Sequence, residues 1–323
     1  MGKLDDSTKV YLQDNYVFAD VCNFFLFDGK PVIDPNQLHE MDTTAVSIIP
    51  YTNRKNQGKA DSVQKYRDVL KSVVVKQDSE AAYVLMGIEN QSDIHYAMPV
   101  RNMVYDAMQY EKQVSKKISK HRARQKQKEE KASSKEEFLS GFWKVDKILP
   151  VITLVIYFGA DPWDGPRSLS EMFAVTDTRI LKYVQEYKIW LIEPAALSED
   201  DLKKFTTDLG AVLGIIKYSK DAEQLQTFVR DDLSVTGDAA CVIQDATNIK
   251  LNAKAGKEKI IVCKAIQDIM NKSRQEGRAE GEQKQAMLTV LRMYAKGKSL
   301  DEIADDVGFD VETVKSWILA GNK

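Results

Sequence analysis

The sequence contains few of the residues that build metal and disulfide centres: three cysteines and three histidines among 323 residues. Cys22, Cys241 and Cys263 lie far apart and form no Cys-x-x-Cys pair, and the histidines do not cluster. A structural zinc site and a disulfide framework are therefore not expected. A reducing, intracellular environment fits this composition best.

Long apolar runs are also absent. The most apolar run, residues 151–158, is much shorter than the roughly 20 residues of a membrane span. Residues 1–9 are polar and lack the apolar stretch of a secretion signal. The 46 basic and 48 acidic residues give a net charge of −2, which neither requires nor excludes a nucleic-acid partner. With 43% hydrophobic residues, we expect a globular, cytoplasmic protein without a membrane partner.

The order of the predicted elements indicates an α/β fold. Helical spacing of apolar residues predicts a helix over 14–27, and it resumes at Met98 with Pro99 in the first turn. The valine-rich segment 66–75 and the apolar segment 82–91, separated by a short polar stretch, predict a β-hairpin. The segment 147–158 is typical of a buried central strand. Shorter strands are predicted over 45–51 and 187–192.

Two acidic residues and a glutamine occupy the open end of this hairpin. Asp68 lies near the start of one strand, and Glu89 and Gln91 lie at the end of the next. Residues i and i+2 of a strand share a face, so Glu89 and Gln91 point the same way, and antiparallel pairing brings Asp68 close to Glu89. Two adjacent carboxylates repel each other unless a cation lies between them, and Mg²⁺ (or Mn²⁺) favours such oxygen ligands. The alternative is that these are solvated residues at the rim of a sheet.

Three more residues are candidates for a supporting role. Asp20, on the first predicted helix, could supply a further carboxylate or could be an exposed helix residue. Arg101 and Tyr105 are four residues apart and share a helix face. They could brace the carboxylates or contact a phosphate, or they could be a pair that packs one helix onto its neighbour.

A basic stretch follows, between residues 112 and 135, with few acidic residues. Such a stretch can neutralise DNA phosphates without reading sequence, and the alternative is a solvated helical extension. Aromatic residues are not interleaved with the lysines there, so stacking on single strands is not expected. The candidate contacts to the DNA backbone are Lys116, Lys117, Lys120, Arg122 and Arg124.

The C-terminal segment 298–319 has helix-turn-helix form. Ser299 and Glu302 can form a capping box, and Gly308 can make the turn between the two helices. Acidic residues outnumber basic ones in this segment, so packing or dimerisation is at least as well supported as DNA binding. Residues 274–285, which are charged and contain two glycines, predict a connector before it.

Four segments, at 18–33, 66–71, 87–92 and 96–114, resemble a bacterial family of PD-(D/E)XK nucleases called recombination-promoting nucleases or putative transposases. The resemblance covers about the first 160 residues. It implies a restriction-endonuclease-like core made of a helix, a three-stranded meander, a second helix and a fourth strand.

The resemblance also implies roles for individual residues. Asp68 corresponds to the metal-binding aspartate and Glu89 to the acidic residue of the (D/E)XK motif, while Gln91 occupies the position of the lysine. Glutamine can orient water or phosphate but carries no positive charge. A replacement cation elsewhere would be needed for full activity. Lys71 is one candidate, although its strand position faces away from Asp68.

These observations predict an α/β restriction-endonuclease-like core with a mixed central sheet flanked by helices, followed by a helical region and the helix-turn-helix-like unit. We expect a nuclease-like domain at 1–200 with a basic helical insertion at about 112–140, a mainly helical extension at 201–275, and a linker with the C-terminal unit at 276–323. The predicted function is a Mg²⁺-dependent DNA endonuclease in recombination or mobile-element processing.

Two other functions stay open. One is a DNA-binding or regulatory protein that has the nuclease fold but is catalytically degenerate. The other is an assembly protein whose C-terminal helices form a homo-oligomer.

Overall fold

The chain divides into two units, Met1–Cys263 and Lys264–Lys323. The computed structural model describes residues 2–41, 44–48, 62–66, 69–77, 80–229, 233–247, 249–251 and 253–321. No helix in these ranges is both long enough and apolar enough to cross a membrane.

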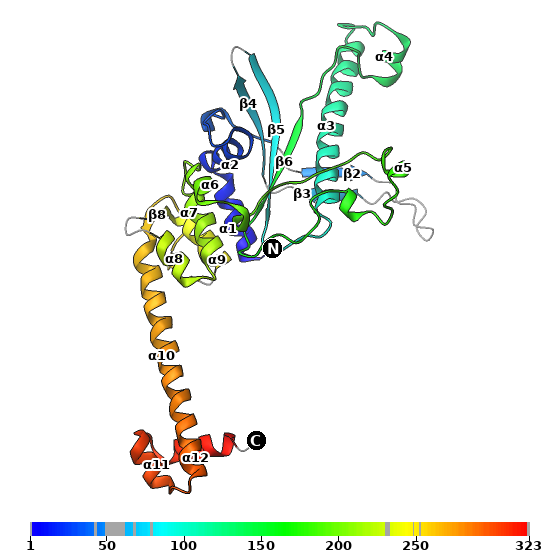
Figure 1. Ribbon diagram of the computed structural model, residues 1–323. Helices are drawn as coiled ribbons and strands as arrows, with labels where there is room; N and C mark the ends of the chain where they lie inside the picture. Colours follow the sequence, from blue (N-terminus) through cyan, green and yellow to red (C-terminus); the bar gives the residue numbers. More distant parts are fainter. Residues whose placement is uncertain are drawn as a thin grey trace. The chain divides into compact units, whose positions relative to one another are not determined.

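The first unit is built around a five-stranded mixed sheet with helices on both faces (Figure 1). The first three strands run antiparallel, and the last three run parallel, so the third belongs to both sets. In spatial order they are β1 (His39–Glu40), β4 (Val69–Gln77), β5 (Glu80–Gln91), β6 (Val151–Tyr157) and β7 (Trp190–Ile192). The predicted α/β class with a mixed sheet is confirmed.

A separate antiparallel pair joins β2 (Thr44–Ile48) to β3 (Ser62–Tyr66). The predicted strand over 45–51 corresponds to β2. Strand β6 is buried along nearly its whole length, as expected for a central strand whose valines and isoleucines face helices on both sides.

Helices α1 (Lys3–Gln13) and α2 (Asn15–Phe27) cover one face of the sheet. Asn90 of β5 donates a hydrogen bond of 2.6 Å to the Thr8 hydroxyl, and Asp14 caps the start of α2 through the backbone N–H groups of Tyr16 and Val17. The second helix was predicted and is confirmed. The first was not predicted, because Met1–Lys9 has too few apolar residues to show a period.

Helix α3 (Met98–Lys126) covers the opposite face. Its Asp106 accepts a hydrogen bond of 2.5 Å from Thr153 of β6 and one of 2.6 Å from Tyr187. The predicted start at Met98 is confirmed. Neighbouring residues of β5 thus belong to different layers: Glu89 and Gln91 face α3, while Asn90 faces α1.

Short helices and a small antiparallel ribbon complete this unit. Tyr11 of α1 donates a hydrogen bond of 2.5 Å to Asp208, which also accepts one of 2.8 Å from the backbone N–H of Thr236. These contacts attach the later part of the unit to α1. The elements are α4 (Lys135–Ser140), α5 (Thr178–Leu181), α6 (Glu199–Lys203), α7 (Leu209–Tyr218), α8 (Ala222–Phe228), β8 (Ser234–Thr236), α9 (Gly237–Ala246) and β9 (Lys259–Ile261).

The second unit contains the rest of α10 (Val262–Ala295), then α11 (Leu300–Val307) and α12 (Val311–Gly321). Five buried residues form its core: Val290, Ile303, Ala304, Val314 and Ile318. Ser299 and Glu302 form the predicted capping box, and Gly308 ends α11 with a φ of 71°.

The predicted connector at 274–285 is wrong, because these residues lie inside α10. Glutamate, lysine, arginine and glutamine are strong helix formers, and they outweigh a cost of about 1 kcal/mol for each of the two glycines.

Candidate active site at the end of strand β5

Glu89 is a buried carboxylate near the end of the shared strand. Its side chain has no exposed surface, and its backbone pairs with Val155 of β6. Across the sheet face, Nη2 of Arg101 lies 3.3 Å from Oε2 of Glu89. An ionised carboxylate out of contact with water requires a nearby cation, and Arg101 supplies it from the first turns of α3.

Tyr105 holds the guanidinium of Arg101 in place. Nε of Arg101 donates a hydrogen bond of 3.2 Å to the Tyr105 hydroxyl, and the guanidinium carbon lies 5.6 Å from the centre of that ring. The side chain of Arg101 keeps 31% of its surface exposed. Arg101 therefore contacts the buried carboxylate on one side and solvent on the other. A phosphate in the solvent could reach the same guanidinium.

Gln91 lies two residues beyond Glu89 on the same face and is 7% exposed. Its Nε2 donates a hydrogen bond of 2.8 Å to the backbone oxygen of Asn90. Gln91 and Arg101 both line an open cavity of about 320 Å³ at the end of β5. Its other lining residues are Asp5, Asn90, Ser92, Asp93, Ile94 and His95.

Negative charge collects around this end of the sheet. Burial raises the pKa of Tyr157, which pairs with Gln91 in register, and the nearby carboxylates of Asp161 and Asp93 raise it further. A phenol is kept neutral by such surroundings because the phenolate would face other anions. Of these two carboxylates, Asp161 forms an ion pair of 2.6 Å with Lys220, and Asp93 lines the cavity.

Asp68, the predicted partner of Glu89, lies outside the described residues. The residue after it, Val69, pairs with Ile88, the residue before Glu89. Among the residues that the structure describes, there is no group of three or more histidine, cysteine, aspartate or glutamate side chains that could hold a metal ion. The predicted pairing of the two carboxylates therefore stays a prediction.

Asp20 is buried on α2, and its hydrogen-bond partners are threonines of a distant segment rather than residues near Glu89. It is 2% exposed, and its two oxygens accept hydrogen bonds from the backbone N–H groups and hydroxyls of Thr206 and Thr207, at 2.6 to 3.1 Å. The exposed alternative is wrong. Asp20 joins α2 to the segment before α7, and this contact set gives no support to a role in metal binding.

Lys71 is not the replacement cation that was considered. It is fully buried, and its Nζ donates a hydrogen bond of 2.6 Å to the backbone oxygen of Gln13 and one of 2.5 Å to Asn15. Lys71 pairs with Met86 of β5 and therefore shares its face of the sheet. Met86 and Glu89 are three residues apart on one strand, so Lys71 and Glu89 lie on opposite faces. Its charge holds the corner between α1 and α2.

The five basic candidates for DNA contact lie along the second half of α3. Lys116, Lys120 and Arg122 are exposed. Lys117 lies 3.9 Å from Asp146, and Arg124 forms an ion pair with Glu130. Three of the five are thus directed to solvent. Of the other two, Lys117 contacts the segment that returns from α4, and Arg124 contacts the turn between α3 and α4.

Sequence reasoning missed Asp5, Asn90 and His95 as lining residues of the cavity. Ser92 donates a hydrogen bond to the Asp5 carboxylate, which brings α1 to the end of β5. Asp5 could not be found without predicting α1. Asn90, between Glu89 and Gln91, offered a signal, since a polar residue pointing into a helix layer requires a partner.

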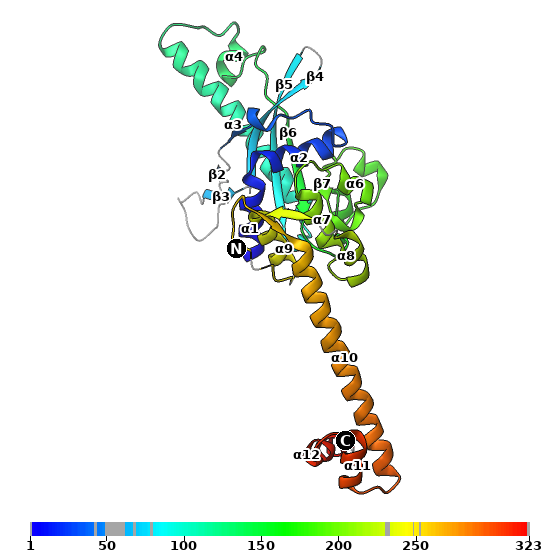
Figure 2. The ribbon, with the colours of Figure 1, turned by 90° about the vertical axis from the view of Figure 1, so that its left-hand side faces the viewer.

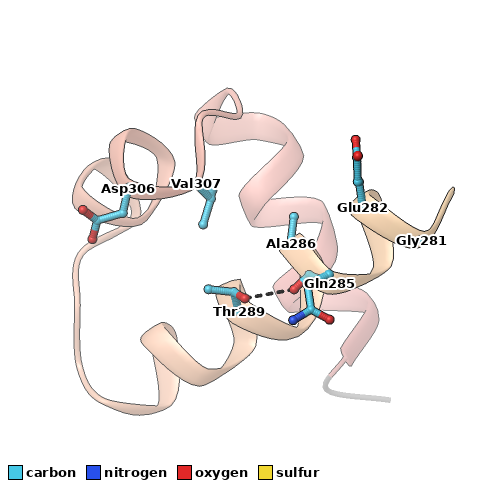
Figure 3. A pocket seen from close by; sticks show the side chains of 7 residues that line it. All are labelled: Gly281, Glu282, Gln285, Ala286, Thr289, Asp306 and Val307. Atoms are coloured by element: carbon cyan, nitrogen blue, oxygen red, sulfur yellow. Dashed lines mark hydrogen bonds between the residues drawn. The ribbon is translucent and has the colours of Figure 1, made fainter. Parts of the chain in front are cut away.

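A second pocket, of about 590 Å³, lies within residues 264–323, between α10 and α11 (Figure 3). It is lined by Gly281, Glu282, Gln285, Ala286, Thr289, Asp306 and Val307. None of these seven residues is basic, so this pocket does not suit a phosphate.

A family model described as putative transposase, YhgA-like, matches residues 60–236, more than half of the chain. The chain belongs to this family of putative transposases, so the predicted family is confirmed. The match begins at residue 60 and extends to residue 236, whereas the resemblance was predicted over about the first 160 residues. Membership indicates a role in DNA processing and interaction with DNA. No curated protein and no solved structure matches the chain.

Proposed function

We propose that the chain is a Mg²⁺-dependent DNA endonuclease that hydrolyses phosphodiester bonds during recombination or mobile-element processing. The observation that supports this most is that Arg101 contacts the buried Glu89 and, together with Gln91, lines an open cavity at the end of β5. The order of elements supports it too: helices, then the antiparallel strands β1, β4 and β5, then α3 and the parallel strand β6. That order is the one implied by a restriction-endonuclease-like core.

The residues present suit a hard divalent cation. Glu89 is a desolvated carboxylate with a positive group 3.3 Å away, and Asp93 adds a second carboxylate in the lining of the neighbouring cavity. Glu89 and Asp68 would hold the ion through their oxygens, which are the ligands Mg²⁺ prefers. When bound, Mg²⁺ supplies Lewis-acid catalysis and lowers the pKa of a water molecule.

The protein side chains would do the positioning. Gln91 can orient the attacking water or a phosphate oxygen through its amide. Arg101 would supply the positive charge that Gln91 lacks, since its planar guanidinium can face a phosphate while Tyr105 holds it. The exposed Lys116, Lys120 and Arg122 would hold the DNA backbone without reading sequence.

The direct test is nicking of supercoiled plasmid in Mg²⁺, with EDTA as the metal-free arm. Asp68→Ala and Glu89→Gln are expected to abolish nicking, because each removes a metal ligand, while the circular dichroism spectrum is retained. Asp177→Asn, which changes a surface carboxylate near α5, is the matched control and should nick as the wild type does. Unchanged nicking by Asp68→Ala would refute the assignment.

A second candidate is a DNA-binding protein without catalysis. The complete burial of Glu89 and the glutamine in place of a catalytic lysine favour it. It predicts DNA binding that weakens steeply with salt and no metal-stimulated cleavage by the wild type. Plasmid nicking and binding titrations on the same preparation separate the two candidates.

A further inference from the structure

The basic stretch folds into a lobe of its own, formed by residues 112–147 and called here the α3–α4 lobe. It contains the second half of α3, the helix α4 and the segment that leads back toward β6, and α4 lies at the end of α3 far from the sheet (Figures 1 and 2). Twelve lysine and arginine residues and five acidic residues give it a net charge of +7, in a chain whose total is −2.

Buried contacts fix the return segment against α3. The ring of His121 stacks on Trp143, with ring centres 3.8 Å apart and planes inclined by 12°. Nε2 of His121 lies 2.9 Å from Asp146, which also accepts a hydrogen bond of 2.8 Å from the backbone N–H of Trp143. Gly141 has a φ of 70°, and a Cβ there would lie 2.9 Å from Ile118, so the chain turns back in close contact with α3.

The acidic side chains of the lobe are largely used inside it. Glu130 pairs with Arg124, and Glu137 accepts hydrogen bonds from the backbone N–H groups of Lys144 at 3.0 Å and Ser133 at 2.8 Å. The donors at Lys144 and Ser133 hold the pKa of Glu137 below its usual range. These contacts hold the carboxylates against the lobe itself, and its net charge stays +7.

Three large apolar side chains are exposed on the same lobe, and a fourth directly follows it. Phe138 and Leu139 on α4 are 66% and 67% exposed, and Val145 and Ile148 in or next to the return segment are 77% and 38% exposed. Adjacent exposed apolar residues on a rigidly held element mark an interaction site. They lie on, or directly after, a lobe with a net charge of +7, which favours a polyanion as the partner.

We propose that the tip of the α3–α4 lobe, centred on Phe138, stacks on unpaired bases of DNA while the lysines of the lobe hold the phosphates. This proposal rests on the proposed function as a DNA-processing protein. Stacking on an aromatic ring tolerates any base, because every base has a π face. Leu139 supplies apolar contact beside the ring. The partner is thus DNA with a single-stranded or forked region next to duplex.

The length of α3 connects this tip to the cavity. Twenty residues separate Arg101, which lines the cavity, from His121, on which the return segment packs. At about 1.5 Å per residue this is roughly 30 Å, the length of about nine base pairs. A duplex arm of about nine base pairs therefore extends from the cavity to the part of α3 on which the return segment packs, and a fork that reaches the tip needs at least this length.

The test measures DNA binding by the full chain in EDTA, so that cleavage plays no part. Fluorescence anisotropy compares a forked DNA, having a duplex arm of about 20 base pairs to exceed that span, with a blunt duplex of equal length. Phe138→Ala is expected to weaken fork binding about tenfold and duplex binding less than about twofold. Phe138→Trp should retain wild-type affinity. Tyr183→Ala, which removes an aromatic side chain 77% exposed outside the lobe, is the matched control and should change neither affinity.

A spectroscopic readout separates stacking from general loss of affinity. With 2-aminopurine at the unpaired position next to the junction, wild type and Phe138→Trp should change its fluorescence at saturation, and Phe138→Ala should not. Equal loss on fork and duplex, no loss on either, or no binding of forks by the wild type would each overturn the inference. So would binding to vesicles of anionic lipid that depends on Phe138 while fork binding does not, because the tip would then be a membrane contact.

Failure of this inference and failure of the proposed function give different results. If the wild type nicks plasmid in Mg²⁺ but Phe138→Ala binds forks normally, only the stacking role is wrong. If Phe138→Ala loses fork binding but the wild type never nicks, only the nuclease assignment is wrong.

Discussion

The pair formed by Glu89 and Arg101 makes the sharpest stability prediction. Arg101→Met keeps much of the unbranched apolar stem and removes the charge that lies 3.3 Å from the buried Glu89. Breaking a fully buried ion pair costs about 3–5 kcal/mol. Because Arg101 is 31% exposed, water can reach the pair, so we expect the free energy of unfolding to fall by roughly 2–3 kcal/mol.

A double-mutant cycle isolates the charge term. Combining Arg101→Met with Glu89→Gln removes both charges, so the double variant should regain about 1–2 kcal/mol relative to Arg101→Met alone. The assay is urea unfolding followed by tryptophan fluorescence and circular dichroism. Lys116→Met, an exposed position on the same helix, is the control and should stay within about 0.5 kcal/mol of the wild type.

Magnesium adds an arm that does not depend on activity. If Glu89 and Asp68 bind Mg²⁺, the ion replaces the lost positive charge, so millimolar Mg²⁺ should stabilise Arg101→Met more than it stabilises the wild type. Mg²⁺ should have no such effect on the double variant. An Arg101→Met protein that unfolds at the wild-type urea concentration would refute the reasoning, because Glu89 would then be balanced by another group.

Three further predictions concern the scaffold. Asp20→Ala leaves the N–H groups of Thr206 and Thr207 without an acceptor and should cost roughly 3 kcal/mol in urea unfolding; loss of metal-dependent nicking by the folded variant would contradict a purely structural role. Burial opposes ionisation of Asp14, but Lys257 and two backbone N–H groups outweigh it and hold its pKa below 3.8. Asp14→Ala should therefore lose about 1 kcal/mol at pH 7, and the gap to the wild type should close as the pH falls below about 4; a gap independent of pH would exclude this ionic contribution. Gly141→Val places a side chain against Ile118 at positive φ and should increase protease cleavage within 112–147 before global unfolding; an unchanged cleavage rate would show that the turn is not constrained.

Elements with a clear period or composition could be predicted from the sequence. Strand β6 is a run of buried branched residues, and the start of α3 is marked by Pro99. The capping box at Ser299 and the glycine at 308 gave the bounds of α11. Each of these signals lies within a few residues of the element that it defines.

The parts that could not be predicted depend on contacts between distant residues. Asp20 meets Thr206, 186 positions away, and no local pattern announces that partner. The spacing of Arg101 and Tyr105 gave their shared face but not the contact with Glu89, which depends on how α3 lies on β5. The basic stretch lacked aromatics only when read as far as residue 135. Folding brings Trp143 back onto His121 and leaves Phe138 exposed, three residues after Lys135.

The two-layer arrangement around β5 limits how this strand can vary. Glu89 and Asn90 are neighbours in the chain, yet one contacts Arg101 on α3 and the other contacts Thr8 on α1. Inserting or deleting one residue earlier in the strand would exchange their faces, placing the amide under α3 and the carboxylate beneath α1. The geometry that buries Glu89 therefore disfavours a one-residue change of length in this segment, whereas a substitution leaves the alternation of faces intact.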